Sequence, residues 1–296
     1  MTATSNLIHA PEDVRRQFRE NYNRTPFTFE HHIAGHELFQ LPQLADLIKR
    51  LDKFPGQVYY DLGSNASVGR GWDQSGQHSA DPQTLIRSME TAGAWMILKS
   101  TQTDPPYAAF LEDCLGEIHM LSGRDMARET HGHIMSIIVS SPGKVTPYHI
   151  DGECNFLFQI KGSKLVYVFN GSDRSVLADD ELEKFWAGDL NAAKYRESTQ
   201  AQAYAFELQP GQAVHVPVNY PHWVQNGSEV SISISMNFSF RDTRMADLYR
   251  ANFNLRRLGL HPSPPGQSKM VDATKLATYR LHSVIRKRLA GRSPLP

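Results

Sequence analysis

The sequence contains little that supports the common enzyme chemistries or a nucleic-acid site. Two cysteines, Cys114 and Cys154, are too few for a disulfide framework or a cysteine-based zinc site. The 31 basic and 31 acidic residues cancel, so net charge gives no argument for nucleic-acid binding. A glycine-rich phosphate loop with lysine, a His-Glu-x-x-His helix and a Gly-x-Ser-x-Gly elbow are all missing. The common rival chemistries are therefore unsupported.

Long apolar runs are also missing. No stretch approaches the roughly 18 apolar residues that a membrane helix needs. The first residues lack a basic region followed by an apolar run, so the sequence predicts no secretory signal. We therefore expect no membrane partner and a soluble protein in a reducing compartment, the cytoplasm. The 296 residues, 40% of them hydrophobic, suit one large domain or a domain with helical additions.

What the chain does contain is a split set of metal ligands. One residue separates His149 from Asp151, and His222 follows far downstream in a Val-Asn-Tyr-Pro-His-Trp segment. On an extended strand, alternate residues point to the same face, so the first two side chains can converge on one ion. Two imidazoles and one carboxylate on one face of an octahedral ion leave three adjacent positions open. This arrangement is typical of non-haem Fe(II) oxygenases.

Lys164 follows the first two ligands in the chain. Two apolar, β-prone runs, residues 155–160 and 164–169, flank a short turn with Gly162 and predict a hairpin. If Lys164 points inward, its ammonium needs an anionic partner, because an unpaired buried charge is costly and its strand carries no acidic residue. The carboxylate of a bound small molecule would satisfy it. Alternatively, Lys164 is a surface residue at the end of the hairpin.

The segment around His222 resembles the second sequence motif of cupin barrels, with Asn219 where glycine is usual. Its marker residues, in order, are Gly211, Pro217, Asn219, His222 and Asn226. After it, residues 229–240 alternate polar and apolar side chains, the period of a half-buried strand.

Together these segments resemble the JmjC-type, cupin-like Fe(II)- and 2-oxoglutarate-dependent oxygenases, closest in motif to the asparaginyl hydroxylase acting on hypoxia-inducible factor. The likeness is best over residues 146–164 and resumes over 210–240. It implies a mainly β fold with flanking helices, namely a double-stranded β-helix of the jelly-roll or cupin type. We accordingly divide the chain into a helical or mixed N-terminal region (1–100) packing on the barrel, the barrel core (101–241) and C-terminal helices (242–296).

The resemblance also implies a role for each candidate residue. His149, Asp151 and His222 would bind Fe(II) and form the catalytic centre. Lys164 would pair with the distal carboxylate of 2-oxoglutarate, and Thr146 would hydrogen-bond to that same end.

Asn155 and Asn237 would lie by the metal-bound end of the co-substrate or by the bound water. The sequence departs from the asparaginyl hydroxylase after Asn237, because Ser239 stands where that enzyme has a tryptophan of its substrate site. The metal and co-substrate sites are thus better supported than any particular peptide substrate.

The resemblance implies a dioxygenase that hydroxylates an unactivated C–H bond of a protein side chain or small molecule, with release of succinate and CO2. An alternative is a non-catalytic cupin that binds a metal or has a regulatory role. Another is a cupin enzyme that works without 2-oxoglutarate, a class that often uses three or four ligands dominated by histidine. Lys164, Thr146 and Asn237 argue for the oxygenase, because a simple metal barrel needs no 2-oxoglutarate pocket.

Other histidines lack this context. His131 and His133 have strand spacing but no carboxylate partner and no following lysine, so we expect them to be structural. His215 lies on the strand before His222, where its side chain can face either the core or the site.

The remaining elements are predicted from apolar periodicity. We expect a strand at 59–62, an exposed loop at 63–82 and helices at 11–21, 42–52, 82–100, 107–119, 179–187, 242–258 and 270–290. The last helix has an apolar face of Leu281, Val284, Ile285 and Leu289 that offers a homodimer contact, as in the hydroxylase that this chain resembles. We interpret the basic residues at its end as a solvated face.

Overall fold

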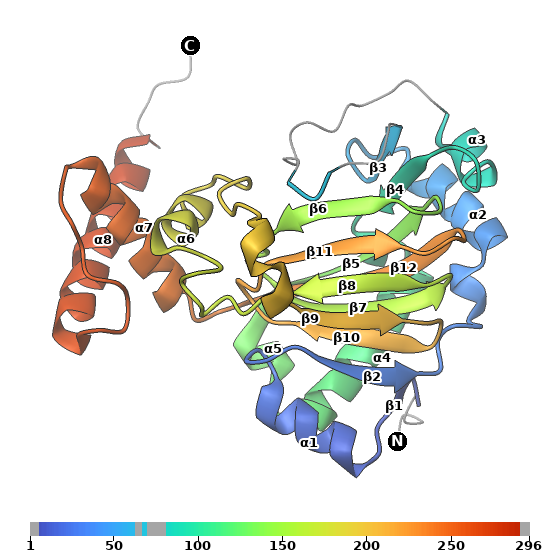
Figure 1. The fold of residues 1–296 in the computed structure, drawn as a ribbon, viewed down its shortest axis with the longest axis horizontal. Helices are drawn as coiled ribbons and strands as arrows, with labels where there is room; N and C mark the ends of the chain where they lie inside the picture. Colours follow the sequence, from blue (N-terminus) through green and yellow to red (C-terminus); the bar gives the residue numbers. More distant parts are fainter. Residues whose placement is uncertain (1–5, 63–66, 70–80, 291–296) are drawn as a thin grey trace.

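Antiparallel strands dominate the fold. The structure is a computed structural model and is described for residues 6–62, 67–69 and 81–290. The strands are β1 (Ile8–His9), β2 (Phe27–His31), β3 (Val58–Leu62), β4 (Ala94–Leu98), β5 (Thr130–Ser140), β6 (Val145–His149), β7 (Cys154–Lys161), β8 (Lys164–Val168), β9 (Tyr204–Leu208), β10 (Gln212–Val216), β11 (His222–Asn226) and β12 (Ser231–Phe240). They form an eight-stranded sheet, β1-β2-β10-β7-β12-β5-β4-β3, and a four-stranded sheet, β6-β11-β8-β9 (Figure 1).

Helices flank this pair of sheets. They are α1 (Glu12–Asn21), α2 (Leu41–Leu51), α3 (Pro82–Arg87), α4 (Pro105–Ser122), α5 (Met126–Glu129), α6 (Asp179–Trp186), α7 (Arg244–Arg257) and α8 (Lys269–Ala290), with 3-10 turns η1 (Glu37–Phe39), η3 (Thr101–Thr103) and η4 (Glu197–Gln202). Helices α7 and α8 lie at one end of the barrel, beyond α6 (Figure 1). Over the described ranges, none of the helices is both long and apolar enough to cross a membrane.

The alternating side chains of β12 show how the sheets acquire two different faces. Ile232, Ile234, Met236 and Phe238 are buried in the largest hydrophobic core, which also holds the apolar stripes of α1, α2 and α4. The intervening serines point to the opposite face, toward the smaller sheet. The expected fold class, mainly β with flanking helices and a double-stranded β-helix, is confirmed.

Two smaller hydrophobic clusters pack on the two faces of the smaller sheet. Between the sheets, Leu157, Val166, Val168, Val214 and Val224 form a small aliphatic cluster with Leu208 and Val216. The outer face of the smaller sheet is instead covered by the segment that carries α6, whose apolar side chains pack on residues of β6, β8 and β11 and on α7. Consequently, the smaller sheet is enclosed on both sides at the end where β6 finishes.

The predicted hairpin between β7 and β8 is wrong, although both strands exist. β7 pairs with β10 and β12, whereas β8 pairs with β9 and β11 in the other sheet. The turn is therefore a corner between sheets. Gly162 has φ 66°, and a Cβ there would lie 2.7 Å from the Val230 carbonyl oxygen. Both runs are mainly apolar, so only strands distant in sequence decide which sheet each one joins.

The predicted helix at 82–100 is also wrong. It ends early, as α3, and Ala94–Leu98 forms β4, which pairs with β3 and β5. The helix already ends at Arg87, and Gly93, with φ 59°, lies directly before β4, in which the burial of alternate side chains follows the period of a strand. Strands β1 and β2 were not predicted. Residues 6–98 thus supply four strands to the larger sheet. The predicted 63–82 loop lies almost wholly outside the described residues.

Candidate metal centre

The three predicted metal ligands lie together at one end of the barrel. His149 is the last residue of β6 and His222 the first of β11, and these two residues are directly paired across the strands. Asp151 lies two residues beyond the end of β6 rather than within it. Its Oδ2 is 3.6 Å from Nε2 of His222 and 4.0 Å from Nε2 of His149. Each of the three residues offers one ligand atom, and these three atoms all lie within 4.8 Å of one another.

Backbone carbonyls fix the tautomer of both histidines. Nδ1 of His149 donates to the carbonyl oxygen of Pro147 at 2.7 Å, and Nδ1 of His222 donates to that of Tyr220 at 3.0 Å. A carbonyl only accepts, so the proton of each neutral ring sits on Nδ1 and the Nε2 lone pair faces Asp151. Burial and, to a lesser extent, the nearby His222 lower the pKa of His149 to about 4. Neutral imidazoles are the form that binds a metal.

This donor set fits a divalent metal ion. Ligand atoms about 2.1 Å from an ion and at right angles to each other lie about 3 Å apart. The observed separations of 3.6 and 4.0 Å need only a small closure to reach that value. The two histidine side chains are 10–11% exposed and that of Asp151 is 33% exposed, so the cluster opens toward solvent on the side of the carboxylate.

Lys164 points into the barrel, as one of the two predicted alternatives required. On β8, Lys164, Val166 and Val168 are buried on one face, and both valines belong to the aliphatic cluster between the sheets. Lys164 is 3% exposed, and burial lowers its pKa to about 7. Within the part of the chain that the structure describes, its ammonium makes no hydrogen bond or ion pair. It is a buried cation without a protein counter-charge.

Register places Lys164 and the metal ligands along one face of the smaller sheet. Val168 pairs with His222, Val166 with Val224, and Lys164 with Asn226. Thr146 also pairs with Val224, so it lies between the level of the histidines and the level of Lys164.

The two predicted asparagines face this strip from the larger sheet. Asn155 of β7 is paired with Asn237 of β12, and the Asn155 side-chain amide donates to the Asn237 side-chain oxygen and, at 2.6 Å, to Oγ of Ser235. Asn237 also donates to Ser235 at 3.2 Å. Ser235 was not predicted. The alternation of serine and apolar residues along β12 was the signal that could have identified it.

The remaining histidines have structural contacts. His215 is fully buried on the opposite face of the larger sheet, where Nε2 accepts the Asn23 backbone N–H at 2.9 Å and Nδ1 donates to the Asn155 carbonyl at 3.0 Å. Nε2 of His133 lies 2.7 Å from Oγ1 of Thr130. His131 is exposed.

The region from α1 to the start of α7 matches a single family model. Residues 10–244 match the model described as a cupin-like domain. The chain belongs to this family. This match includes every residue of the metal cluster and both sheets except β1.

Curated relatives of this cupin-like chain include HSPB1-associated protein 1 of Homo sapiens, 25% identical over 41% of this chain and 27% of the relative. The Danio rerio homologue is 30% identical over 30% of this chain and 22% of the relative. The chain therefore spans about a quarter of the length of these relatives.

Among solved structures, Escherichia coli ycfD superposes with a TM-score of 0.49 at 17% identity, over 94% of this chain and 69% of that one. A structure of YcfD, described as a ribosomal oxygenase in complex with cobalt and 2-oxoglutarate, gives a TM-score of 0.48 at 14% identity, over 94% and 68%.

Proposed function

We propose that this cupin-like chain is an Fe(II)- and 2-oxoglutarate-dependent dioxygenase that hydroxylates an unactivated C–H bond, with release of succinate and CO2. The observation that carries the proposal is the cluster of His149, Asp151 and His222, in which both imidazoles present Nε2 to one carboxylate. Two histidines and one carboxylate leave coordination positions open for a co-substrate and dioxygen. Bound Fe(II) would activate dioxygen for the oxidative decarboxylation of 2-oxoglutarate.

Lys164 supports 2-oxoglutarate as the co-substrate. It lies four residues along the strand from the level of His222, a separation of about 13 Å. The side chains of Lys164 and of the two histidines extend from the same face of the sheet, so the space between the ammonium and the metal cluster has the length of a short dicarboxylate. One carboxylate would neutralise the buried ammonium while the other end reached the metal. Thr146 lies between the two levels and would donate its hydroxyl to the distal carboxylate.

Asn155 and Asn237 would contact the metal-bound end. The Asn155 amide is held by Ser235 and Asn237, so the pair has a fixed orientation before any ligand binds. Polar side chains held in a fixed orientation can contact a ligand without a further entropic cost. We propose a protein side chain, a peptide or a small molecule as the substrate.

The decisive experiment is succinate production from 2-oxoglutarate by anaerobically purified, Fe(II)-loaded protein on exposure to air. We expect turnover by the wild type and none by Asp151→Ala. Glu153→Gln is the matched control, because this carboxylate lies on the same segment but outside the ligand cluster. Absence of both succinate and 2-oxoglutarate binding in the wild type would favour a non-catalytic cupin instead.

A further inference from the structure

One aromatic side chain contacts both segments that carry the metal ligands. Trp186, the last residue of α6, packs its indole against Gly152, which directly follows Asp151. A Cβ on Gly152 would lie 3.1 Å from Cη2 of Trp186, so the ring comes as close to the backbone as only glycine allows without displacement. The six-membered edge of the ring thus limits where the Asp151 segment can lie.

The indole N–H reaches the other ligand segment. Nε1 of Trp186 donates to the side-chain oxygen of Asn219 at 3.1 Å. The backbone N–H of Asn219 in turn donates to the carbonyl oxygen of Asp151 at 3.0 Å. Asn219 has φ 64°, a left-handed conformation that aims its backbone and side chain in these two directions, and His222 follows three residues later. One side chain therefore bridges the segments of Asp151 and His222.

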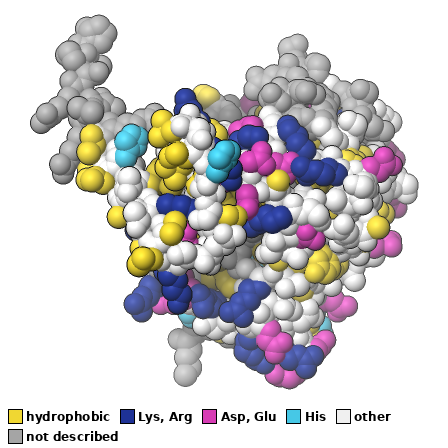
Figure 2. Space-filling model, turned by 60° about the vertical axis from the view of Figure 1, so that its left-hand side comes forward, with side chains coloured by type: hydrophobic (Ala, Val, Ile, Leu, Met, Phe, Trp, Pro, Cys, Tyr) yellow, Lys and Arg dark blue, Asp and Glu magenta, His cyan; other side chains and the backbone are white. Residues whose placement is uncertain are grey.

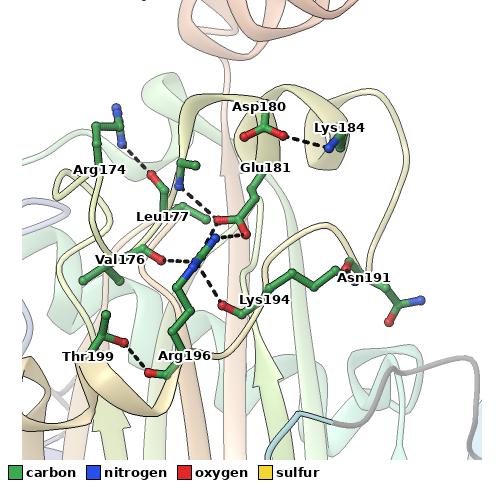
Figure 3. Close-up of polar contacts among 11 residues, drawn as sticks. Arg174, Val176, Leu177, Asp180, Glu181, Lys184, Asn191, Lys194, Arg196 and Thr199 are labelled. Atoms are coloured by element: carbon green, nitrogen blue, oxygen red, sulfur yellow. Dashed lines mark hydrogen bonds and ion pairs between the residues drawn. The ribbon is translucent and has the colours of Figure 1, made fainter.

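A part-buried ion pair holds the first turn of α6, the helix that ends at Trp186. Arg196 binds the carboxylate of Glu181 through both terminal nitrogens, at 2.6 and 3.3 Å, and also donates to the Val176 carbonyl (Figure 3). Glu181 additionally accepts the backbone N–H of Ala178. The side chain of Glu181 is 7% exposed, so this paired and saturated carboxylate fixes the start of α6.

Arg250 of α7 holds the same tryptophan from the C-terminal side. Its Nε donates to the Trp186 carbonyl at 2.8 Å, and its guanidinium lies 5.3 Å from the centre of the indole ring. A cavity of about 380 Å³ borders both residues. The Trp186 side chain thus has polar contacts on two sides, with Asn219 and Arg250, beside its packing contact with Gly152.

We propose that Trp186 is a positioning residue that sets the separation of Asp151 from His222, and that Arg250 holds Trp186 in place. The inference rests on the proposed metal site. Trp186 is not part of the ligand cluster and acts on it through Gly152 and Asn219. The C-terminal helix α7 is thereby coupled to the geometry of the metal ligands.

The test is a Co(II) titration of the metal-free protein, followed by calorimetry and by the visible absorption of the bound ion. Trp186→Phe keeps an aromatic ring beside Gly152 and loses the N–H, so we expect Co(II) binding weaker by about fivefold to tenfold, with a changed Co(II) spectrum. Asn219→Gly keeps the left-handed backbone and its N–H but loses the side-chain acceptor. We expect the same loss from it, and no further loss in the double variant.

Trp223→Phe is the matched control. Its indole N–H donates to Gln200 at 3.2 Å, on the outer face of the smaller sheet, although Trp223 is the immediate neighbour of His222. We expect its Co(II) affinity and spectrum to equal those of the wild type. Arg250→Lys removes the stacked guanidinium and should weaken binding about twofold to threefold, in the direction of Trp186→Phe.

Asp151→Ala in the same titration separates the positioning role of Trp186 from the metal site itself. Tight wild-type binding that is lost in Asp151→Ala but unchanged in both Trp186→Phe and Asn219→Gly would overturn the positioning role alone. Equal binding by wild type and Asp151→Ala would overturn the metal site, and the positioning role with it. If Trp186→Phe does not fold, as judged by circular dichroism, Asn219→Gly tests the same contact from its other end.

Discussion

The two faces of β7 and β12 place similar strand backbones in opposite chemical surroundings. On the face toward the helices, Phe156, Phe158, Met236 and Phe238 pack in a core that is apolar except for a few satisfied groups. On the face toward the smaller sheet, Asn155 and the serines of β12 lie opposite the predicted metal ligands and Lys164. The first face stabilises the fold, whereas the second retains polar groups that a ligand can engage.

His215 and His222, seven residues apart, differ in the same way as the two faces. On the core face, His215 has both ring nitrogens hydrogen-bonded within the protein and stacks on Phe156 with centroids 4.5 Å apart. Burial lowers its pKa to about 3. On the site face, His222 uses only Nδ1 for the backbone and directs Nε2 at Asp151. A ring nitrogen left available for a metal, rather than burial, distinguishes the candidate ligand His222 from His215.

The largest expected effects come from replacing each of these two histidines with alanine. We expect His222→Ala to abolish Co(II) binding and to change the free energy of unfolding of the metal-free protein by no more than about 1 kcal/mol. His215→Ala should leave Co(II) stoichiometry intact and destabilise the protein by about 3 kcal/mol, because it opens a cavity and leaves two backbone groups without partners. Urea unfolding and metal titration measure both quantities. Loss of metal from a stable His215→Ala variant would contradict the separation of the two faces.

A smaller but more specific effect is expected at Lys164. Lys164→Met should weaken 2-oxoglutarate binding about tenfold or more, because the distal carboxylate loses its counter-charge. The same change should stabilise the ligand-free protein, since an uncompensated ammonium leaves the interior. Calorimetry and urea unfolding report the two effects. Lys161→Met is the matched control, because this exposed lysine lies across the same corner. Unchanged 2-oxoglutarate binding in Lys164→Met would remove Lys164 from the site.

The lowered pKa of Lys164 should also make the stability of the protein depend on pH. Its pKa is about 7 in the folded protein, against an ordinary value of 10.5. Between these values the unfolded chain binds a proton that the folded chain does not, so stability should rise as pH increases from 7 to 10.5. Binding of a dicarboxylate should reverse the shift, because the anion favours the charged ammonium.

Two measurements follow from this shift. Urea unfolding of the wild type should show the rise in stability with pH, and Lys164→Met should lack this contribution. Calorimetry of 2-oxoglutarate binding near pH 8, in buffers of different ionisation enthalpy, should show net proton uptake by the wild type alone. Equal proton uptake by both proteins would assign it to another group.

The fold class and the metal cluster could be predicted because their signals are local. The spacing of His149 and Asp151, the segment of His222 and the serine alternation after it each lie within a dozen residues. The corner at Gly162 could not be predicted, since the choice of sheet depends on pairing with β9 to β12. The strand Ala94–Leu98 could not be predicted for the same reason, because its partners lie in β3 and β5.

Trp186 shows why the supporting contacts of the site were missed. In sequence it reads as an apolar residue at a helix end, thirty-five positions after Asp151 and thirty-three before Asn219. Its role depends on the approach to Gly152 and on the left-handed backbone of Asn219, which only the folded chain shows. The one available signal was Asn219 in a position where glycine is usual, since asparagine tolerates that backbone conformation.

The barrel and the C-terminal helices differ in how many large hydrophobic side chains they expose. Twelve large hydrophobic side chains are exposed in the described residues, and eight of them lie between Met245 and Ile285. Leu281, Val284 and Ile285 are 64%, 46% and 49% exposed. Figure 2 shows hydrophobic side chains gathered over this end of the molecule. A self-complementary apolar patch is what a twofold dimer buries, so the predicted homodimer contact falls here.

We expect light scattering coupled to size-exclusion chromatography to give a dimer for the wild type and a monomer for the double variant Val284→Glu/Ile285→Glu. The matched control is Met120→Glu, an equally exposed apolar residue on α4, which should remain dimeric. Because these helices pack beyond α6, the monomeric variant should keep Co(II) stoichiometry and lose little affinity. A monomeric wild type at micromolar concentration would contradict the dimer, whereas a monomeric variant that also loses its metal would show that α8 supports the ligand segments through α7.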